Sequence, residues 1–219
     1  MTEESPPPWQ FGERALDQTT RLASAVRRVV GLATSLEGEE PCVEELITAL
    51  EAAEHRLAAV APTDTAPRVG AEIHPSGRVY LDHARDIGAF NPCVPLYDID
   101  VVGNTATGSV SFPLTYEGPP GLVHGGFIAV FFDCVIQHHN CDVGRSGKTT
   151  SLTVTYRRPT PLDTDLRFSI RRYDQGDRIS STATLLAGQR VLCEAEMSAV
   201  ASDRHALPEV SPRRIDRDR

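Results

Sequence analysis

Residues 124–138 read His-Gly-Gly-Phe-Ile-Ala-Val-Phe-Phe-Asp-Cys-Val-Ile-Gln-His, and this stretch decides the fold. Its side chains are apolar on nearly every side of a helical projection, so we expect one helix that is buried nearly all round. The sequence that follows and precedes it alternates between apolar and polar residues instead. The stretch therefore predicts a single central helix enclosed by strands.

The alternation extends over about 78–202 and has the two-residue period of antiparallel strands. It is clearest in 151–156, 166–171, 179–185 and 191–197. We expect an α+β fold in which a curved antiparallel sheet with one dry face wraps around the central helix. Because such a sheet leaves strand edges unpaired, we also expect at least a dimer.

The rest of the chain divides into three further zones. Residues 1–61 form a helical extension, because apolar residues recur every three or four positions in 22–36 and again in 43–60. This double pattern predicts a helical hairpin that carries no chemical motif. Residues 62–77 have the composition of a linker, and the charged stretch 203–219 is expected to be a disordered tail.

Composition excludes several classes of function. The chain has 22 Lys and Arg residues against 30 Asp and Glu residues, a net charge of −8. This balance argues against nucleic acid as a partner, since nonspecific binding relies on neutralising phosphates. No apolar run approaches the roughly 20 residues that span a bilayer. The five cysteines are scattered without a Cys-x-x-Cys pair, so we expect a reduced cytoplasmic protein without a structural metal.

Asp133 is the first candidate for chemistry. Six apolar residues (127–132) precede it and three more (134–136) follow it, so its carboxylate is expected to be poorly hydrated. A carboxylate held in such a cleft is a candidate general base or nucleophile. The alternative is a structural acid, paired or solvated on an exposed strip of the helix.

The second candidate is the segment that opens the same helix, His124, Gly125 and Gly126. Free amides at a helix N-terminus carry partial positive charge, and glycines leave them open to a carbonyl oxygen. The alternative is an ordinary turn before a helix. Asp133 lies nine residues after His124, roughly 13 Å along the axis at about 1.5 Å per residue. If both groups act on one substrate, the site is therefore shared between two protomers.

Two segments stand out together: residues 118–133 read Gly-Pro-Pro-Gly-Leu-Val-His-Gly-Gly-Phe-Ile-Ala-Val-Phe-Phe-Asp, and residues 149–162 read Thr-Thr-Ser-Leu-Thr-Val-Thr-Tyr-Arg-Arg-Pro-Thr-Pro-Leu. Together they resemble the hotdog-fold acyl-CoA thioesterases of the phenylacetate-pathway (PaaI-like) type. The resemblance covers about 95–201. It implies a hotdog fold, a place in fatty acid metabolism, and hydrolysis of an acyl-CoA to a free acid and coenzyme A. It also implies a homodimer or a dimer of dimers (a homotetramer), with no cofactor beyond the coenzyme A of the substrate.

The resemblance assigns roles to five residues. Asp133 corresponds to the acid that attacks the thioester carbonyl or activates water. Gly125 corresponds to the residue whose amide polarises that carbonyl, with Gly126 beside it. His124 corresponds to a histidine that orients the loop or contacts the thioester. Thr149 corresponds to the hydroxyl that positions water, although an ordinary strand threonine is the alternative.

Two further sets of side chains have more than one interpretation. Arg157 and Arg158 could bind the phosphates of coenzyme A, or could form a solvated strand end. His138, His139 and Asp142 suggest a metal site, but adjacent helical histidines diverge by about 100°. A polar cluster at a helix end is the better interpretation, and we expect no metal.

Two other functions stay open at this stage. One is a non-catalytic acyl-CoA-binding or regulatory protein, which would keep the pocket and tolerate loss of Asp133. The other is an enoyl-CoA hydratase or lyase, for which Asp133 and His138 reproduce an Asp-x4-His spacing. That spacing falls here within the central helix rather than in a loop ahead of it, which disfavours the hydratase.

Overall fold

The computed structural model describes residues 17–61, 87–143 and 146–202. The predicted linker over 62–77 and the predicted tail over 203–219 lie outside these residues. The elements, in chain order, are α1 (Asp17–Thr34), α2 (Pro41–Val60), α3 (Ile87–Phe90), β1 (Tyr97–Val102), β2 (Thr105–Val110), the 3-10 helix η2 (Leu114–Tyr116), α4 (Gly125–Val143), β3 (Ser146–Tyr156), β4 (Leu166–Asp174), β5 (Arg178–Ala187) and β6 (Arg190–Ser202).

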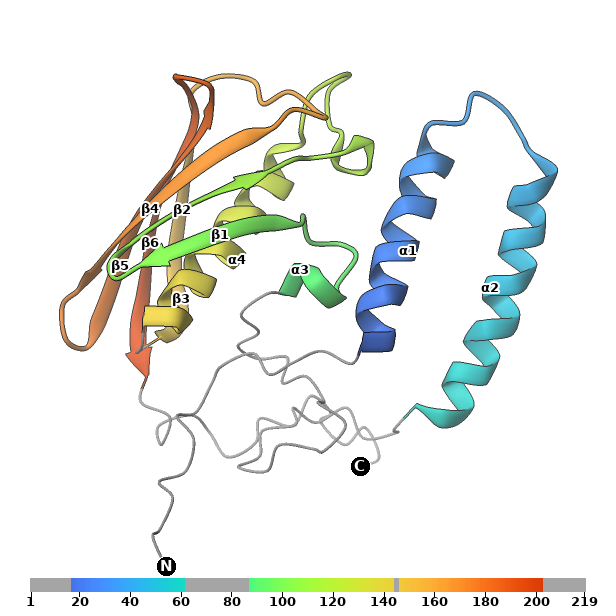
Figure 1. Ribbon diagram of the computed structural model, residues 1–219, viewed down its shortest axis with the longest axis horizontal. Helices are drawn as coiled ribbons and strands as arrows, with labels where there is room; N and C mark the ends of the chain where they lie inside the picture. Colours follow the sequence, from blue (N-terminus) through green and yellow to red (C-terminus); the bar gives the residue numbers. More distant parts are fainter. Residues whose placement is uncertain (1–16, 62–86, 144–145, 203–219) are drawn as a thin grey trace, which may run out of the picture.

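The six strands form one antiparallel sheet in the order β1-β2-β4-β5-β6-β3. The sheet curves around α4, which lies against its concave face (Figure 1). The central helix and the antiparallel sheet are confirmed as predicted. At the two ends of the sheet, β1 pairs only with β2 and β3 only with β6 among the described strands.

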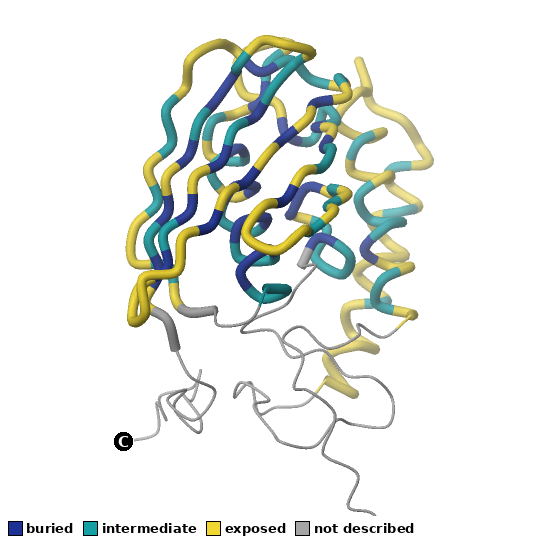
Figure 2. Tube along the Cα trace, turned by 60° about the vertical axis from the view of Figure 1, so that its left-hand side comes forward, coloured by how far each residue is buried: buried dark blue, intermediate teal, exposed yellow. Residues whose placement is uncertain are grey.

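Burial follows the predicted alternation along the strands (Figure 2). In β4, the side chains of Leu166, Phe168 and Ile170 are buried and those between them are exposed. At the start of β6, the alternation over 191–197 predicted that Val191 is buried and Leu192 is not. This prediction is wrong, because Leu192 is buried and Val191 is not. A register shift opposite Leu185 and Leu186 inserts one residue there, and the extra residue turns Leu192 inward.

The predicted all-round burial of the central helix is only partly correct. One face of α4 is fully buried and supplies much of the core, with Phe131, Phe132, Val135 and Ile136 at 0% exposure. On the opposite face, Gly126 is exposed and Val130 keeps 40% of its surface exposed. The curved sheet covers one side of the helix, so an open strip runs along the other.

The N-terminal helices attach to this core through α1. Arg27 donates from Nη2 to three backbone carbonyl oxygens around α3: Gly88 at 2.7 Å, Asn91 at 3.0 Å and Val94 at 3.2 Å. α1 thereby packs against α3 and η2 and lies between α3 and α2 (Figure 1). α2 follows a short turn, as a hairpin requires, but has no buried residue.

Candidate active site

Asp133 lies on α4 at the border between its buried face and its open strip, and it is partly buried. Its carboxylate Oδ1 accepts a hydrogen bond of 2.9 Å from the Thr149 hydroxyl on β3. Thr149 in turn accepts a hydrogen bond of 2.8 Å from the Gln137 side-chain amide, one helical turn beyond Asp133. Two of the predicted site residues are thus in direct contact.

A β-bulge brings Thr149 to this position. In β3, Leu152 and Val154 face the buried side, opposite Met197 and Ala195 of β6, so strict alternation would turn Thr150 inward. The register shifts between Thr149 and Ser151, and this shift reverses the alternation. Thr149 therefore lies opposite the buried Ala199 and faces α4. Bulges commonly redirect side chains beside active sites in this way.

The segment that opens α4 is fixed by backbone hydrogen bonds. The His124 N–H donates to the Tyr116 carbonyl at 2.9 Å, and the Val123 N–H donates to the Thr160 carbonyl at 2.9 Å. The loop also comes close to Gly118, where an added Cβ would lie 2.8 Å from the His124 Cα. The start of the helix is therefore held between η2 and the residues that follow β3.

The two glycine amides differ in their partners. The Gly126 N–H donates to Nδ1 of His124 at 3.0 Å. Among the residues that the structure describes, the Gly125 N–H has no hydrogen-bond acceptor. The His124 ring thus caps the Gly126 amide within the turn that opens α4. Of the two glycine amides, only that of Gly125 is left without an acceptor within the described part of the chain.

Tyr156, at the end of β3, was not among the predicted site residues. Its hydroxyl donates to the Gly125 carbonyl oxygen at 2.8 Å. A Cβ added at Gly125 would lie 3.2 Å from the ring of Tyr156, so this close packing favours glycine. Burial raises the pKa of Tyr156, which keeps its hydroxyl protonated as a donor. The signal in the sequence is its place in Tyr-Arg-Arg-Pro, directly before the two predicted arginines.

Gly125 and Asp133 are eight residues apart on one helix, α4. At about 1.5 Å per residue, this spacing separates them by about 12 Å along the axis. A carbonyl bound at the Gly125 amide is therefore out of reach of the Asp133 carboxylate in the same chain. A single protomer therefore holds the two candidate groups apart, and we call their surroundings the Gly125 and Asp133 half-sites.

Arg157 and Arg158 lie beyond the end of β3 and are exposed. Arg157 forms an ion pair of 2.7 Å with Glu194 on β6, and both side chains are about half exposed. Arg158 donates from Nη1 to the Val191 carbonyl oxygen at 2.7 Å. Both residues directly follow Tyr156, which contacts Gly125, and both guanidiniums already have a partner on β6.

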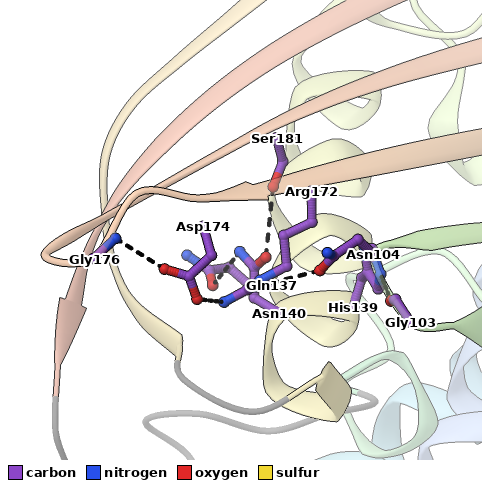
Figure 3. Close-up of polar contacts among 9 residues, drawn as sticks. All are labelled: Gly103, Asn104, Gln137, His139, Asn140, Arg172, Asp174, Gly176 and Ser181. Carbon is purple, nitrogen blue, oxygen red and sulfur yellow. Dashed lines mark hydrogen bonds and ion pairs between the residues drawn. The ribbon is translucent and has the colours of Figure 1, made fainter.

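Polar side chains gather around the C-terminal half of α4 (Figure 3). His139 is fully buried, its Nε2 lies 2.9 Å from the Gly103 carbonyl oxygen, and burial lowers its pKa. The adjacent His138 instead lies 3.0 Å from the Tyr97 hydroxyl. The two histidines diverge, and within 17–61, 87–143 and 146–202 no three His, Cys, Asp or Glu side chains form a group that could hold a metal ion.

No protein-family model matches the chain. Among solved structures, it is similar to a thioesterase superfamily protein, with 24% identity, a TM-score of 0.68, and coverage of 89% of this chain and 98% of that chain. It is also similar to a Streptococcus mutans protein bound to acetyl-CoA (14% identity, TM-score 0.47, 49% of this chain and 89% of that chain). A third is thioesterase superfamily member 2 from Mus musculus (12% identity, TM-score 0.45, 48% and 82%).

The first of these similarities covers 89% of the chain, more than the sheet and α4 together make up. None of the described helices is both long enough and apolar enough to cross a membrane. The arrangement of a curved six-stranded antiparallel sheet around one long helix is the hotdog fold. The chain therefore has the hotdog fold seen in thioesterase superfamily proteins, extended by two N-terminal helices.

Proposed function

We propose that the protein is an acyl-CoA thioesterase, which hydrolyses an acyl-CoA to a free acid and coenzyme A. The observation that carries this proposal is the 2.9 Å hydrogen bond from Thr149 to the Asp133 carboxylate, within a fold that thioesterase superfamily proteins share. A carboxylate held in one orientation by a hydroxyl is suited to act as base or nucleophile. The proposed location is the cytoplasm.

The complete site is assembled from two protomers, in a homodimer or a dimer of dimers. The separation of Gly125 from Asp133 within one chain requires a second copy. The open strip of α4 around Val130 is the surface on which that copy packs, and Asp133 borders it. The free edge of β3 adjoins the same strip, since Thr149 of β3 contacts Asp133 of α4. A second copy placed there brings its own Gly125 toward this Asp133.

The reaction follows from these groups. The free Gly125 amide donates to the thioester carbonyl oxygen and stabilises the negative charge that develops on it. Asp133 of the other protomer removes a proton from water as the water oxygen adds to the carbonyl carbon. Alternatively, its carboxylate adds to that carbon, and water hydrolyses the resulting anhydride. In either route the carbon–sulfur bond breaks and the thiolate of coenzyme A takes up a proton.

Arg157 and Arg158 are proposed to bind the phosphates of coenzyme A near the Gly125 half-site. Arginine binds phosphate in a bidentate manner, and both side chains are exposed. Arg157 exchanges its Glu194 partner for phosphate in this arrangement. The reaction needs no metal or redox cofactor, because a thioester is already activated toward hydrolysis.

The test is a panel of short-chain, long-chain and aromatic acyl-CoAs, with release of free thiol followed by a colorimetric reagent. We expect saturable thiol release from at least one ester. Isothermal titration with the same panel runs in parallel. Tight binding without thiol release would identify a non-catalytic acyl-CoA-binding protein. Hydration of an enoyl-CoA without thiol release would identify the hydratase.

Tyr156→Phe is expected to lower kcat/KM by about three- to tenfold, the value of one lost hydrogen bond. The variant removes the donor to the Gly125 carbonyl and leaves the ring in place, so the Gly125 amide is oriented less firmly. The measurement is kcat/KM on the best ester of the panel. Tyr173→Phe, at an exposed tyrosine of β4, is the matched control and should behave as wild type. If kcat/KM is the same for Tyr156→Phe and Tyr173→Phe, Tyr156 does not contribute to the site.

A further inference from the structure

We propose that Gln137 is a positioning residue for Asp133, and that it acts by directing the Thr149 proton onto the Asp133 carboxylate. The inference rests on the proposed function and deepens it. Gln137 lies four residues after Asp133 on α4, so both side chains are on the same side of the helix. Thr149 of β3 lies between them and contacts both.

The direction of these hydrogen bonds follows from the chemistry of the groups. A threonine hydroxyl has one proton to donate. The Gln137 amide nitrogen donates to Thr149 Oγ1 at 2.8 Å, so a lone pair of that oxygen faces Gln137 and the hydroxyl proton points elsewhere. Its two possible acceptors are Asp133 Oδ1 at 2.9 Å and Met197 Sδ at 3.9 Å. The carboxylate is the closer and the stronger acceptor.

The orientation of the Gln137 amide is set from the other side. Asn140 donates from Nδ2 to Gln137 Oε1 at 3.4 Å. Asn140 is itself fully buried, and its Oδ1 lies 3.5 Å from the Ser181 hydroxyl of β5 (Figure 3). A Gln137 amide turned by 180° would place its nitrogen against the Asn140 nitrogen and its oxygen against Thr149. The hydrogen bonds thus run from Ser181 through Asn140, Gln137 and Thr149 to Asp133, and the Asp133 carboxylate, which can only accept, fixes the direction at that end.

This directed chain has a catalytic consequence. A hydroxyl that donates to a carboxylate stabilises its ionised form, which is the form that a base or a nucleophile needs. The hydrogen bond also occupies Oδ1, so the second carboxylate oxygen is left for the reaction. Without the Gln137 donor, the Thr149 hydroxyl is free to turn away from Asp133.

The decisive variant is Gln137→Glu, which keeps the size of the side chain but reverses its role toward Thr149. A glutamate at 137 accepts the Thr149 proton and so withdraws it from Asp133. We expect kcat on the best ester to fall about tenfold, the effect of losing one hydrogen bond to a charged group. The acidic limb of the pH–kcat profile should move to higher pH. Gln189→Glu, the same change in an exposed turn before β6, should leave both unchanged.

Gln137→Glu also adds a negative charge near Asp133, and a double variant separates that effect from the effect transmitted through Thr149. In a protein that carries Thr149→Val, the hydroxyl is absent but the charge of Gln137→Glu still acts on Asp133. If the effect passes through Thr149, the fold-decrease in kcat caused by Gln137→Glu should be about threefold smaller in Thr149→Val protein than in wild type. An equal effect in both backgrounds would overturn the inference. Gln137→Met tests the donor alone and should lower kcat without a new charge.

A measurement that needs no turnover keeps the inference apart from the proposed function. In protein labelled with 13C at the aspartate carboxyl, the Asp133 resonance is identified by its loss in Asp133→Asn. At neutral pH its chemical shift, which reports hydrogen bonding to the carboxylate, should change in Gln137→Glu and in Thr149→Val, and stay fixed in Gln189→Glu. If no ester is hydrolysed but the resonance moves in both variants, the proposed function fails and the positioning role stands. If esters are hydrolysed and the resonance does not move, the positioning role fails alone.

Discussion

Asp133→Asn is expected to lower kcat for thiol release by about 10³-fold, the range over which a general base contributes. The substitution is nearly isosteric, and the asparagine oxygen can still accept the hydrogen bond from Thr149. The site therefore keeps its shape but loses the Asp133 carboxylate, whether that group acts as a base or as a nucleophile. The measurement is kcat on the ester that wild type hydrolyses fastest, at an enzyme concentration high enough to detect the residual rate.

The matched control is Asp100→Asn, which makes the same change at an exposed position of β1. It should hydrolyse the ester as wild type does. Asp133→Asn should also bind the ester with unchanged affinity and unfold at the same temperature as wild type. Thiol release by Asp133→Asn at the wild-type rate would show that another group performs the chemistry, and the proposed mechanism would then be wrong.

Much of the fold could be predicted because it depends on periodic burial. Residues 127–136 are apolar apart from Asp133, and this pattern predicted a central helix. The two-residue alternation in 166–171 and 179–185 required strands with one buried face, and those strands are β4 and β5. Both patterns arise from the backbone geometry of a helix or a strand, which is the same at every residue of the element.

The contacts that were not predicted depend on single residues at which the helical or strand periodicity is broken or gives no information. The bulge between Thr149 and Ser151 turns Thr149 toward Asp133, and strict alternation would have chosen Thr150. The packing of Tyr156 on Gly125 joins residues 31 positions apart, for which the sequence carries no period. Gln137 was not among the predicted site residues. Its role depends on the direction of hydrogen bonds to a strand, which the sequence does not encode locally.

The open strip on α4 shows a further limit. Sequence reasoning treated Val130 as one more core residue, because its neighbours are all apolar. In the protomer it is 40% exposed, although Phe131 beside it is completely buried. An apolar pattern reports which residues avoid water, but it does not report whether the same chain or a second copy excludes that water. The proposed second copy would exclude water from this strip, which would account for the apolar pattern that predicted all-round burial.

Phe131→Ala is expected to lower the free energy of unfolding by about 3–5 kcal/mol, as large-to-small changes in well-packed cores do. The Phe131 side chain is 0% exposed and lies where α4 meets the sheet. Its ring lies 5.4 Å from Phe168 on β4, 5.7 Å from Phe112 and 6.0 Å from Tyr97 on β1, each in an edge-to-face arrangement. Removing it opens a cavity that these rigid rings cannot fill by small movements.

Urea unfolding followed by circular dichroism measures this loss, and thermal unfolding should show Tm falling by about 10 °C for a chain of this size. The control is Tyr173→Ala, which truncates an aromatic side chain of β4 that is 45% exposed. It should cost about 1 kcal/mol or less, because a half-hydrated ring leaves no sealed cavity. A similar small cost for Phe131→Ala would mean that the helix is not packed against the sheet through these rings. The positions of Asp133 and Gln137 on that helix, and the directed hydrogen bonds built on them, would then lose their support as well.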